Sequence, residues 1–392
     1  MGGSGNDGEH QGRAMSRGRI AVLVSNDLSF DQRVRKTCAT LQKAGYEPVL
    51  IGRRMVKTDA PSIDRPYPTQ RIWLRASQGP MFYLLLQQGL LKALNEVHAN
   101  GGLVAIWAND LDTLGPAVFG GRKWKLDVAY DSHEWFTEAE GLKNKPVRKG
   151  IWTWWQKRMF RHLRRMLTVN EAIAEAYRAE GLEVDVVPNV PKLSPPAVPM
   201  SRADLGWPEQ KTVLLIQGAF MDRDRGALDA VRSLVHLPDT HLALIGAGPE
   251  FDEAPELASA LRVRDRLHVH ERMPFHELCR CTVAADVGLS LDRSTVDNFK
   301  FSLPNKLFDY LHAGLPVVCS DLPVAGRFVT EEGVGQVVET AKGDDGVALA
   351  TSKAVLALLN NKPSSEHLSE VASRYHWGSH EATLLQAIHP LR

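Results

Sequence analysis

The sequence predicts two α/β domains of similar size, each built around a parallel β-sheet with helices on both faces. Three observations lead to this fold class. The chain has 392 residues, more than a single hydrophobic core usually serves. Short apolar segments alternate with amphipathic ones along the chain, which is typical of parallel sheets. A proline-rich segment at 188–199, PNVPKLSPPAVP, interrupts this alternation near the middle and predicts a stiff linker.

The first half, 19–187, contains seven predicted strands with amphipathic helical segments between them. The strands are Ile20–Ser25, Pro48–Gly52, Arg71–Leu74, Leu103–Trp107, Leu126–Asp131, Met166–Asn170 and Val184–Val187. The clearest helical segments are Asp31–Ala44, Met81–His98 and Glu171–Gly181. Because apolar residues recur in these segments with helical spacing, each helix is expected to cover one face of the sheet.

The second half, 200–375, repeats the pattern. Its predicted strands are Thr212–Gln217, His241–Gly246, Arg266–His270, Val287–Leu291 and Pro316–Ser320. Residues 364–391 are predicted to be terminal helices, and 376–392 are expected to cross back to the first domain. Since ligands of parallel α/β sheets bind at the carboxyl ends of strands, we expect the ligand site in a cleft between the two halves.

The composition excludes several classes of protein. Hydrophobic residues make up 44% and charged residues 24% of the chain, and the formal net charge is +1, which excludes a strong global field. The four cysteines lack the paired spacing of a zinc site and are expected to be free thiols in a reducing cytosol. No apolar run approaches the length of a membrane-spanning helix. The Gly-rich residues 1–18 are expected to form a disordered leader.

The stretch SLPNKLFDYLHAGLPVVCS, 302–320, predicts a short helix whose first turn faces a ligand. The proline suits a first helical turn, and the glycine before Leu-Pro suits the position after the last turn. Asn305 and Asp309 share one face of this helix, and Lys306 adds a positive charge to the helix start, which favours a phosphate. A solvated turn with a Lys306–Asp309 pair explains the stretch equally well.

Two further loops follow predicted strands of the second half. Gly218 permits close backbone approach, and Arg223 and Arg225 are a predicted diphosphate clamp, because guanidinium groups match phosphate oxygens. A surface network with the neighbouring aspartates is the alternative. The second loop, LIGAGPEF, contains Gly246 and Gly248 but has phenylalanine where a dinucleotide-binding fingerprint requires glycine or alanine.

Polar residues also follow three strands of the first half, where they are either ligand contacts or helix caps. They are Asn26, Asp31, Arg33, Asn109, Asp110, Asp131, His133 and Glu134. The segment 143–165 has nine Lys or Arg residues, no acidic residue and three tryptophans, which predicts an amphipathic helix on an anionic membrane surface. Nucleic-acid binding is the weaker explanation, because no such motif accompanies the segment.

Together, SLPNKLFDYLHAGLPVV, YDSHEWF, the 218–226 loop and the S-N-D…D-Q-R-V-R-K opening resemble retaining glycosyltransferases of the GT-B fold, family 4. The resemblance runs from about Arg19 to the C-terminus. It implies two Rossmann-like domains facing each other across a cleft, 19–187 for the acceptor and 200–375 for the donor. The sequence departs from the family pattern where Phe301 replaces the first of two motif glutamates, and Asp309 replaces the second. Ala219 stands where the family has an arginine.

The resemblance also implies roles for individual residues and a reaction. A sugar would move, with retention, from a UDP- or GDP-type donor to a hydroxyl acceptor through an oxocarbenium-like state, with no cofactor or metal. The implied catalytic residues are His133, Arg225 and Lys306; the donor-binding residues are Gly218, Arg223, Gly246, Gly248, Asn305 and Asp309; the acceptor-side residues are Asn26, Asp31, Arg33, Asn109, Asp110 and Glu134.

Three alternatives remain open from the sequence. A GT-B sugar-nucleotide 2-epimerase would use a similar cleft without an acceptor. A nicotinamide-dependent dehydrogenase would rest on the G-A-G-P loop. A non-catalytic sugar-nucleotide-binding module is the third, since the first motif glutamate is missing. We expect a cytoplasmic protein that binds a nucleotide sugar and a glycan, lipid-linked or small-molecule acceptor, with 143–165 contacting the membrane.

Overall fold

The structure, a computed structural model, describes residues 16–28, 31–54, 65–194, 197–340 and 343–392. The chain divides into two compact units. Unit 1 comprises the described residues up to Tyr130 together with Ile388–Arg392, and unit 2 comprises Asp131–Ala387. The predicted leader lies almost wholly outside the described residues, as do 195–196 of the predicted linker.

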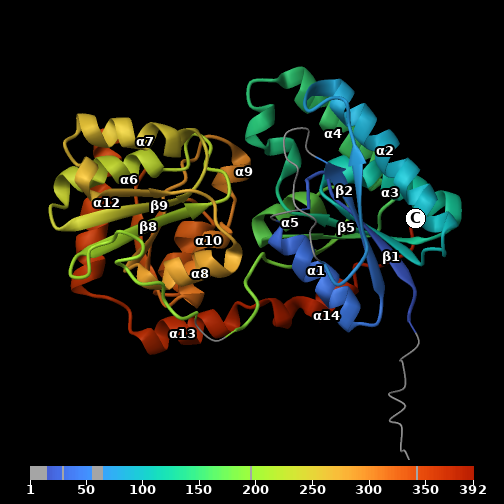
Figure 1. Cartoon of the computed structure of the whole chain (residues 1–392). Helices are drawn as coiled ribbons and strands as arrows, with labels where there is room; N and C mark the ends of the chain where they lie inside the picture. Colours follow the sequence, from blue (N-terminus) through green and yellow to red (C-terminus); the bar gives the residue numbers. More distant parts are fainter. Residues whose placement is uncertain (1–15, 29–30, 55–64, 195–196, 341–342) are drawn as a thin grey trace, which may run out of the picture. The chain divides into compact units, whose positions relative to one another are not determined.

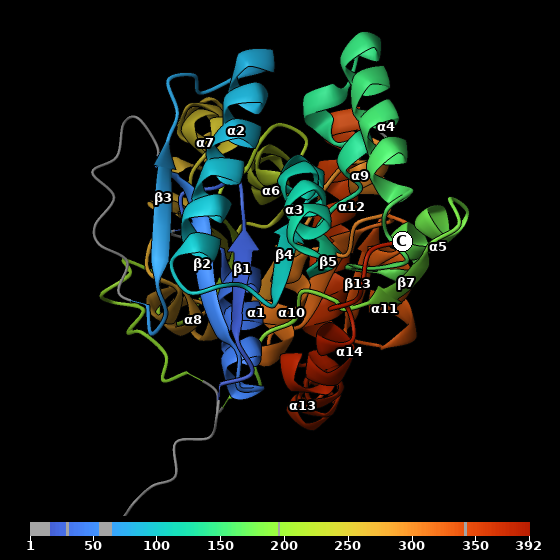
Figure 2. The same ribbon diagram turned by 90° about the vertical axis from the view of Figure 1, so that its right-hand side faces the viewer.

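Among the described residues, seven strands form a first sheet in the order β3-β2-β1-β4-β5-β6-β7. They are β1 Arg19–Leu23, β2 Glu47–Arg54, β3 Thr69–Trp73, β4 Ala105–Asn109, β5 Asp127–Ser132, β6 Arg165–Thr168 and β7 Glu183–Val186. Figure 2 shows β3, β2, β1 and β4 side by side in this order. The pairs of β1 with β2 and with β4 run parallel, and β1 is almost completely buried, as expected for a central strand covered on both faces.

A second parallel sheet has the order β10-β9-β8-β11-β12-β13. Its strands are β8 Thr212–Gly218, β9 Thr240–Gly246, β10 Leu267–His270, β11 Val287–Ser290, β12 Val317–Ser320 and β13 Gly335–Val338. Figure 1 shows α6, α7 and α12 on one face of this sheet and α8 and α10 on the other. Each face has its own hydrophobic core, so the sheet is buried between two helical layers.

Helices lie between most consecutive strands along the chain. In unit 1 they are α1 Gln32–Lys43, α2 Gly79–Ala99 and α3 Leu111–Trp124. In unit 2 they are α4 Pro146–Phe160, α5 Glu171–Arg178, α6 Ala227–Ser233, α7 Pro249–Ala260, α8 Phe275–Ala284, α9 Asp297–Lys300, α10 Asn305–His312, α11 Ala325–Glu331, α12 Gly343–Asn360, α13 Ser365–Arg374 and α14 Glu381–Leu385. None of the helices within the described ranges is long and apolar enough to cross a bilayer.

The predicted strands are all present within one or two residues, and the predicted two-sheet α/β fold is confirmed. Strand β13 was not predicted; it has four residues, of which only Val338 is buried. The predicted helix begins at Asn305, and Pro304, with an extended ψ of 134°, is its N-cap residue instead of part of its first turn. Gly314 has the predicted left-handed conformation, with φ of 73°.

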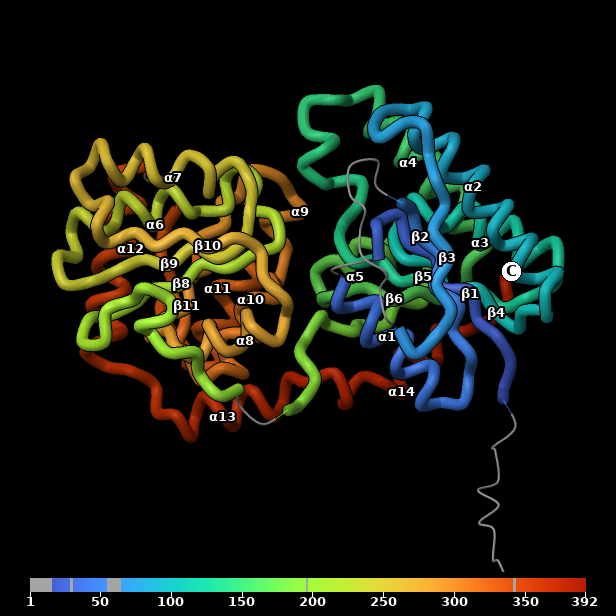
Figure 3. Tube along the Cα trace, in the orientation of Figure 1, coloured from blue at the N-terminus to red at the C-terminus, as the bar shows by residue number. Residues whose placement is uncertain are grey.

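The chain end returns to unit 1. His389 forms an antiparallel bridge with Val128, and the backbone N–H of Val128 donates to the carbonyl of His389. Figure 3 traces the final residues, in red, to this position. The predicted domain limits, 19–187, 200–375 and 376–392, stay a prediction. The two compact units divide the chain after Tyr130.

Candidate active site

Arg225 and Lys306 meet at one buried carboxylate, that of Asp292. The Arg225 Nη1 atom lies 3.1 Å from Asp292 Oδ1, and the Lys306 Nζ atom lies 3.2 Å from Asp292 Oδ2. Arg225 lies in the loop between β8 and α6, Asp292 follows β11, and Lys306 is in the first turn of α10. Because β8 and β11 are parallel neighbours, their carboxyl ends open at the same edge of the sheet and bring these loops together.

The charged groups of this cluster shift one another's pKa values. Burial by itself would raise the pKa of Asp292, but Lys306 and Arg225 more than offset burial and lower it, so the carboxylate is ionised. Burial lowers the pKa of Lys306, and the nearby Arg225 lowers it further, while Asp292 acts in the opposite direction. Two cationic side chains thus share one carboxylate, an arrangement that favours an additional anion.

Arg225 is held in place by an aromatic ring and keeps hydrogen-bonding capacity. Its guanidinium carbon lies 3.9 Å from the centroid of the Phe299 ring, a cation–π contact that orients the group. Its buried Nε has no hydrogen-bond partner among the described residues. The side chain is 29% exposed, so a ligand can reach it. A planar, oriented guanidinium suits a phosphate.

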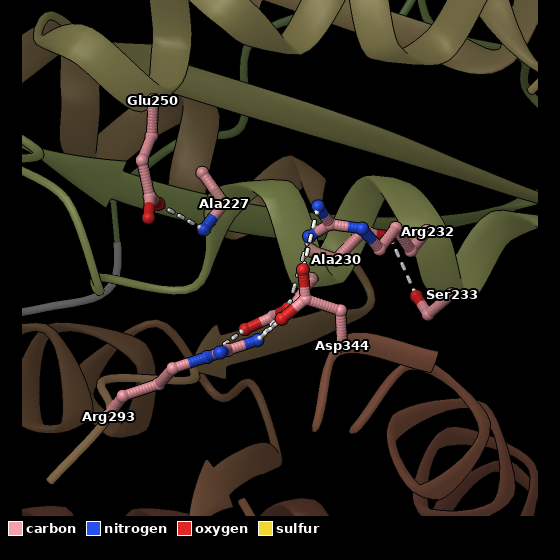
Figure 4. Close-up of polar contacts among 8 residues, drawn as sticks. Ala227, Ala230, Arg232, Ser233, Glu250, Arg293 and Asp344 are labelled. Atoms are coloured by element: carbon pink, nitrogen blue, oxygen red, sulfur yellow. Dashed lines mark hydrogen bonds and ion pairs between the residues drawn. The ribbon is translucent and has the colours of Figure 1, made fainter. Parts of the chain in front are cut away.

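The loop that carries Arg225 is built tightly. The Glu250 carboxylate accepts a hydrogen bond of 2.7 Å from the Ala227 backbone N–H (Figure 4). Burial raises the pKa of Glu250, and hydrogen bonds from the backbone N–H groups of Ala227, Arg225 and Asp224 lower it in part. Gly226 has φ of 84°, and a Cβ there would come within 2.4 Å of the Leu291 carbonyl oxygen. The loop therefore requires glycine at this position and a buried acceptor beneath it.

An ion-pair network fastens the residue after Asp292. Arg293 Nε lies 2.9 Å from Asp229 on α6, and Arg293 Nη2 lies 2.7 Å from Asp344 on α12. Arg232 contacts the same two carboxylates, so each of the two arginines pairs with both aspartates (Figure 4). The backbone N–H of Arg293 donates to the carbonyl of Asp224. These contacts join the Asp292 loop to the Arg225 loop.

The remaining predicted donor-side residues lie around the same sheet edge, with different surroundings. Asp309 accepts a long hydrogen bond of 3.4 Å from Gln217 Nε2, and Asn305 is exposed at the start of α10. Arg223 forms an ion pair with Glu253, outside the cluster, and is 64% exposed. The alternative in which Lys306 pairs with Asp309 in a solvated turn is wrong, because Lys306 is buried and pairs with Asp292.

The predicted glycines bring two strand ends into close contact. Gly218 ends β8 and Gly246 ends β9, and the two residues are register partners. A Cβ on Gly246 would lie 1.9 Å from the Gly218 carbonyl oxygen, and one on Gly248 would lie 2.3 Å from the Met221 carbonyl oxygen. Close backbone packing explains why glycine occupies these positions. That the glycines lie near a nucleotide stays a prediction.

His133 and Glu134 follow β5, as predicted. His133 Nε2 lies 3.5 Å from Asp131 Oδ2, and the Asp131 side chain is fully buried. Glu134 is half-buried, and desolvation raises its pKa, while the hydrogen bond from Asn298 and the charges of His133 and Arg225 lower it. Glu134 was predicted on the acceptor side; the structure places it against Asn298 of α9.

The other predicted acceptor-side residues belong to unit 1. Asp31 caps α1 by accepting the Val34 N–H, and it also accepts from Asn26. Asn109 donates to the Leu23 carbonyl at 2.8 Å and is buried. Arg33 is buried in α1. Asp110 is the N-cap residue of α3, with φ of 61°. These contacts are structural, and the acceptor-side roles stay a prediction.

Two residues of the cluster were missed from the sequence, Asp292 and Asn298. Asp292 follows a predicted strand, and its position at a carboxyl end was a usable signal. Asn298 lies in a four-residue helix with no recognisable pattern. Among the described residues, no group of three or more His, Cys, Asp or Glu side chains is arranged to hold a metal ion.

The chain is similar to domains of known glycosyltransferases. Residues 31–190 match the family described as glycosyl transferase 4-like domain, and residues 199–374 match glycosyl transferases group 1. The lipopolysaccharide core biosynthesis glycosyltransferase LpsD of Rhizobium meliloti (strain 1021) is 28% identical over 187 residues, 48% of this chain and 50% of LpsD. The match thus spans about half the length of that curated relative.

Solved structures share the fold over nearly the whole chain. Sucrose-phosphate synthase from Thermosynechococcus elongatus superimposes with a TM-score of 0.73 at 18% identity, covering 94% of this chain and 98% of that one. Anabaena HepE, solved in complex with UDP-glucose, superimposes with a TM-score of 0.69 at 13% identity, with coverage of 94% and 98%. From the two matched domain families and the shared two-sheet architecture, we conclude that the chain belongs to the GT-B glycosyltransferases.

Proposed function

We propose that this protein is a retaining glycosyltransferase of family 4 that transfers a sugar from a UDP- or GDP-type nucleoside diphosphate sugar to a hydroxyl acceptor. The observation that carries the proposal is the convergence of Arg225 and Lys306 on Asp292 at the carboxyl ends of β8 and β11. Two cations around one carboxylate provide a binding place for the diphosphate, a leaving group whose negative charge grows as the glycosidic bond breaks.

The chemistry follows from these groups. Departure of the diphosphate leaves an oxocarbenium-like sugar, and the acceptor hydroxyl attacks on the face that the diphosphate leaves and gives its proton to an oxygen of the departing diphosphate. Arg225 and Lys306 stabilise the leaving charge without any movement at the moment of reaction, because Phe299 and Asp292 already hold them. In this proposal the fixed cations serve the leaving group and no metal is needed. HepE, solved with UDP-glucose, and LpsD, named for lipopolysaccharide core biosynthesis, support the donor class and a glycan acceptor.

A donor screen tests this function. The purified protein is incubated with a panel of UDP- and GDP-sugars, with and without sugar and lipid-linked acceptors, and free nucleoside diphosphate is measured. We expect one donor to be consumed in an acceptor-dependent manner, with NMR showing the same anomeric configuration in donor and product. Interconversion of sugar nucleotides without an acceptor would instead indicate a 2-epimerase. Binding without consumption of any donor would indicate a non-catalytic module.

We further propose that α4 contacts an anionic membrane and that the acceptor is lipid-linked, with the protein acting on the cytoplasmic face. Val147, Ile151 and Trp154 are 75%, 59% and 63% exposed. Their spacing of four and three residues places them on one face of the helix. Exposed cations surround this face: Lys143, Lys145, Arg148, Lys157, Arg158 and Arg161. An apolar stripe bordered by cations is the surface of an interfacial helix.

Vesicle flotation tests the membrane contact. The protein should co-float at low salt with vesicles containing anionic lipid and not with neutral vesicles, because the cations add electrostatic attraction to the apolar contact. The double substitution Ile151→Asp and Trp154→Asp should abolish co-flotation. Leu356→Asp, at another exposed apolar position on α12, serves as the matched control and should co-float like the wild type. Equal flotation of both variants would refute the role of α4.

A further inference from the structure

Asn298 of α9 uses both ends of its side-chain amide to hold the segment next to His133. Its Nδ2 donates a hydrogen bond of 2.9 Å to Glu134 Oε2, and its Oδ1 accepts one of 2.9 Å from the Trp135 backbone N–H. Asn298 is only 7% exposed, and Glu134 is half-buried. Both groups that Asn298 contacts come directly after His133, so the amide fixes the backbone that follows the histidine.

The neighbours of Asn298 make contacts on both sides of the same site. The Phe299 ring lies against the guanidinium of Arg225 at 3.9 Å. The Phe301 carbonyl accepts a hydrogen bond of 2.9 Å from Asn170 Nδ2, and the Phe301 ring lies 6.0 Å from the Trp135 ring. Four consecutive residues, 298–301, therefore join the His133 segment to the Arg225 side chain.

We propose that Asn298 is a positioning residue, which fixes the His133 segment relative to Arg225 so that both groups face the same donor. The inference rests on the proposed function for the assignment of His133 and Arg225 to the donor. It adds a residue that touches neither the donor nor the leaving group and acts through Glu134 and Trp135.

The chemistry of the two hydrogen bonds explains why asparagine is needed. The site requires a donor toward the Glu134 carboxylate and an acceptor toward the Trp135 N–H, and an amide has both. Aspartate would accept from Trp135 but would place a second carboxylate against Glu134. Alanine would leave the Trp135 N–H and the half-buried Glu134 carboxylate without this partner. The segment would then lose its fixed position, and small displacements of reacting groups are costly in rate.

The variant Asn298→Ala tests the inference in the full-length protein, with the donor that the screen identifies. We expect kcat to fall by about tenfold to a hundredfold, as displacement of a reacting group predicts. The dissociation constant of the free nucleoside diphosphate should stay within about twofold, because Arg225, Lys306 and Asp292 are untouched. The matched control Asn361→Ala, at an exposed position after α12, should retain wild-type kcat.

Two partner variants separate positioning from general loss of structure. Glu134→Ala should lower kcat as Asn298→Ala does, and Glu134→Gln, which keeps an oxygen acceptor for Asn298, should recover most of the rate. The double variant Asn298→Ala/Glu134→Ala should be no slower than Asn298→Ala by more than about twofold, because Asn298→Ala already removes the hydrogen bond that Glu134→Ala removes. Losses that multiply would overturn the inference.

Hydrogen exchange gives a readout that does not depend on turnover. Trp135 donates its amide hydrogen to Asn298, so that amide should exchange faster in Asn298→Ala than in the wild type, while the protection of β8 and β9 stays unchanged. Unchanged exchange at Trp135, or wild-type kcat in Asn298→Ala, would overturn the inference and leave the proposed function standing. A wild-type protein that consumes no donor would overturn the proposed function, whatever the exchange result.

Discussion

Replacing Arg225 with alanine should lower kcat about a hundredfold, the effect of removing one preorganised donor to developing negative charge. The guanidinium is held by Asp292 at 3.1 Å and by the Phe299 ring at 3.9 Å, so it enters the reaction already oriented. Lys306 remains on Asp292 in the variant, and the fold should persist because the Arg225 side chain is partly exposed. Steady-state kinetics with the identified donor, together with a thermal melt, measure both effects.

Two comparison variants sharpen this prediction. Arg225→Lys keeps a positive charge but loses the planar fork, and its kcat should lie between those of Arg225→Ala and the wild type. Arg223→Ala should lose far less, because Arg223 is 64% exposed and pairs with Glu253 instead of Asp292. An Arg225→Ala enzyme with wild-type turnover, or an Arg223→Ala enzyme with the larger loss, would remove Arg225 from the proposed leaving-group site.

Replacing Asp229 with alanine should lower the free energy of unfolding by about 3 kcal/mol, the cost of breaking a buried ion pair from one side. The Asp229 side chain is 3% exposed and accepts from both Arg232 and Arg293 (Figure 4). Without it, the two arginines keep Asp344, which is half-exposed, as a carboxylate partner. Denaturant unfolding followed by circular dichroism measures the loss.

The matched control is Asp239→Ala. Asp239 also pairs with a cation, Lys211, but its side chain is 81% exposed, so the variant should unfold almost like the wild type. The same experiment carries a second expectation. Arg293 follows Asp292 directly and its backbone bonds to the Arg225 loop, so Asp229→Ala should also reduce turnover at temperatures where the protein is still folded. Equal stability of the Asp229 and Asp239 variants would contradict the importance of burial in this network.

Much of the fold could be predicted because its signals are local. Buried parallel strands read as short apolar runs, and glycines such as Gly314 mark helix ends through a backbone conformation that other residues adopt at a cost. The strand β13 escaped prediction because only one of its four residues is buried, so it lacks an apolar run. Arg225 and His133 follow strand ends that are visible in the sequence, and Lys306 stands at a predicted helix start; their catalytic roles stay predictions.

The sequence by itself determined which elements form, which loops follow the strand carboxyl ends, and which cations those loops carry. Only the tertiary structure decided the pairings: that Asp292 binds both Arg225 and Lys306, that Arg223 turns to Glu253, and that Asn298 holds the segment after His133. The physical reason is the sequence distance over which each interaction acts. Hydrophobic periodicity and turn chemistry act over a few neighbouring residues, whereas these pairings join residues 67 and 164 positions apart, and depend on how parallel strands align in the sheet.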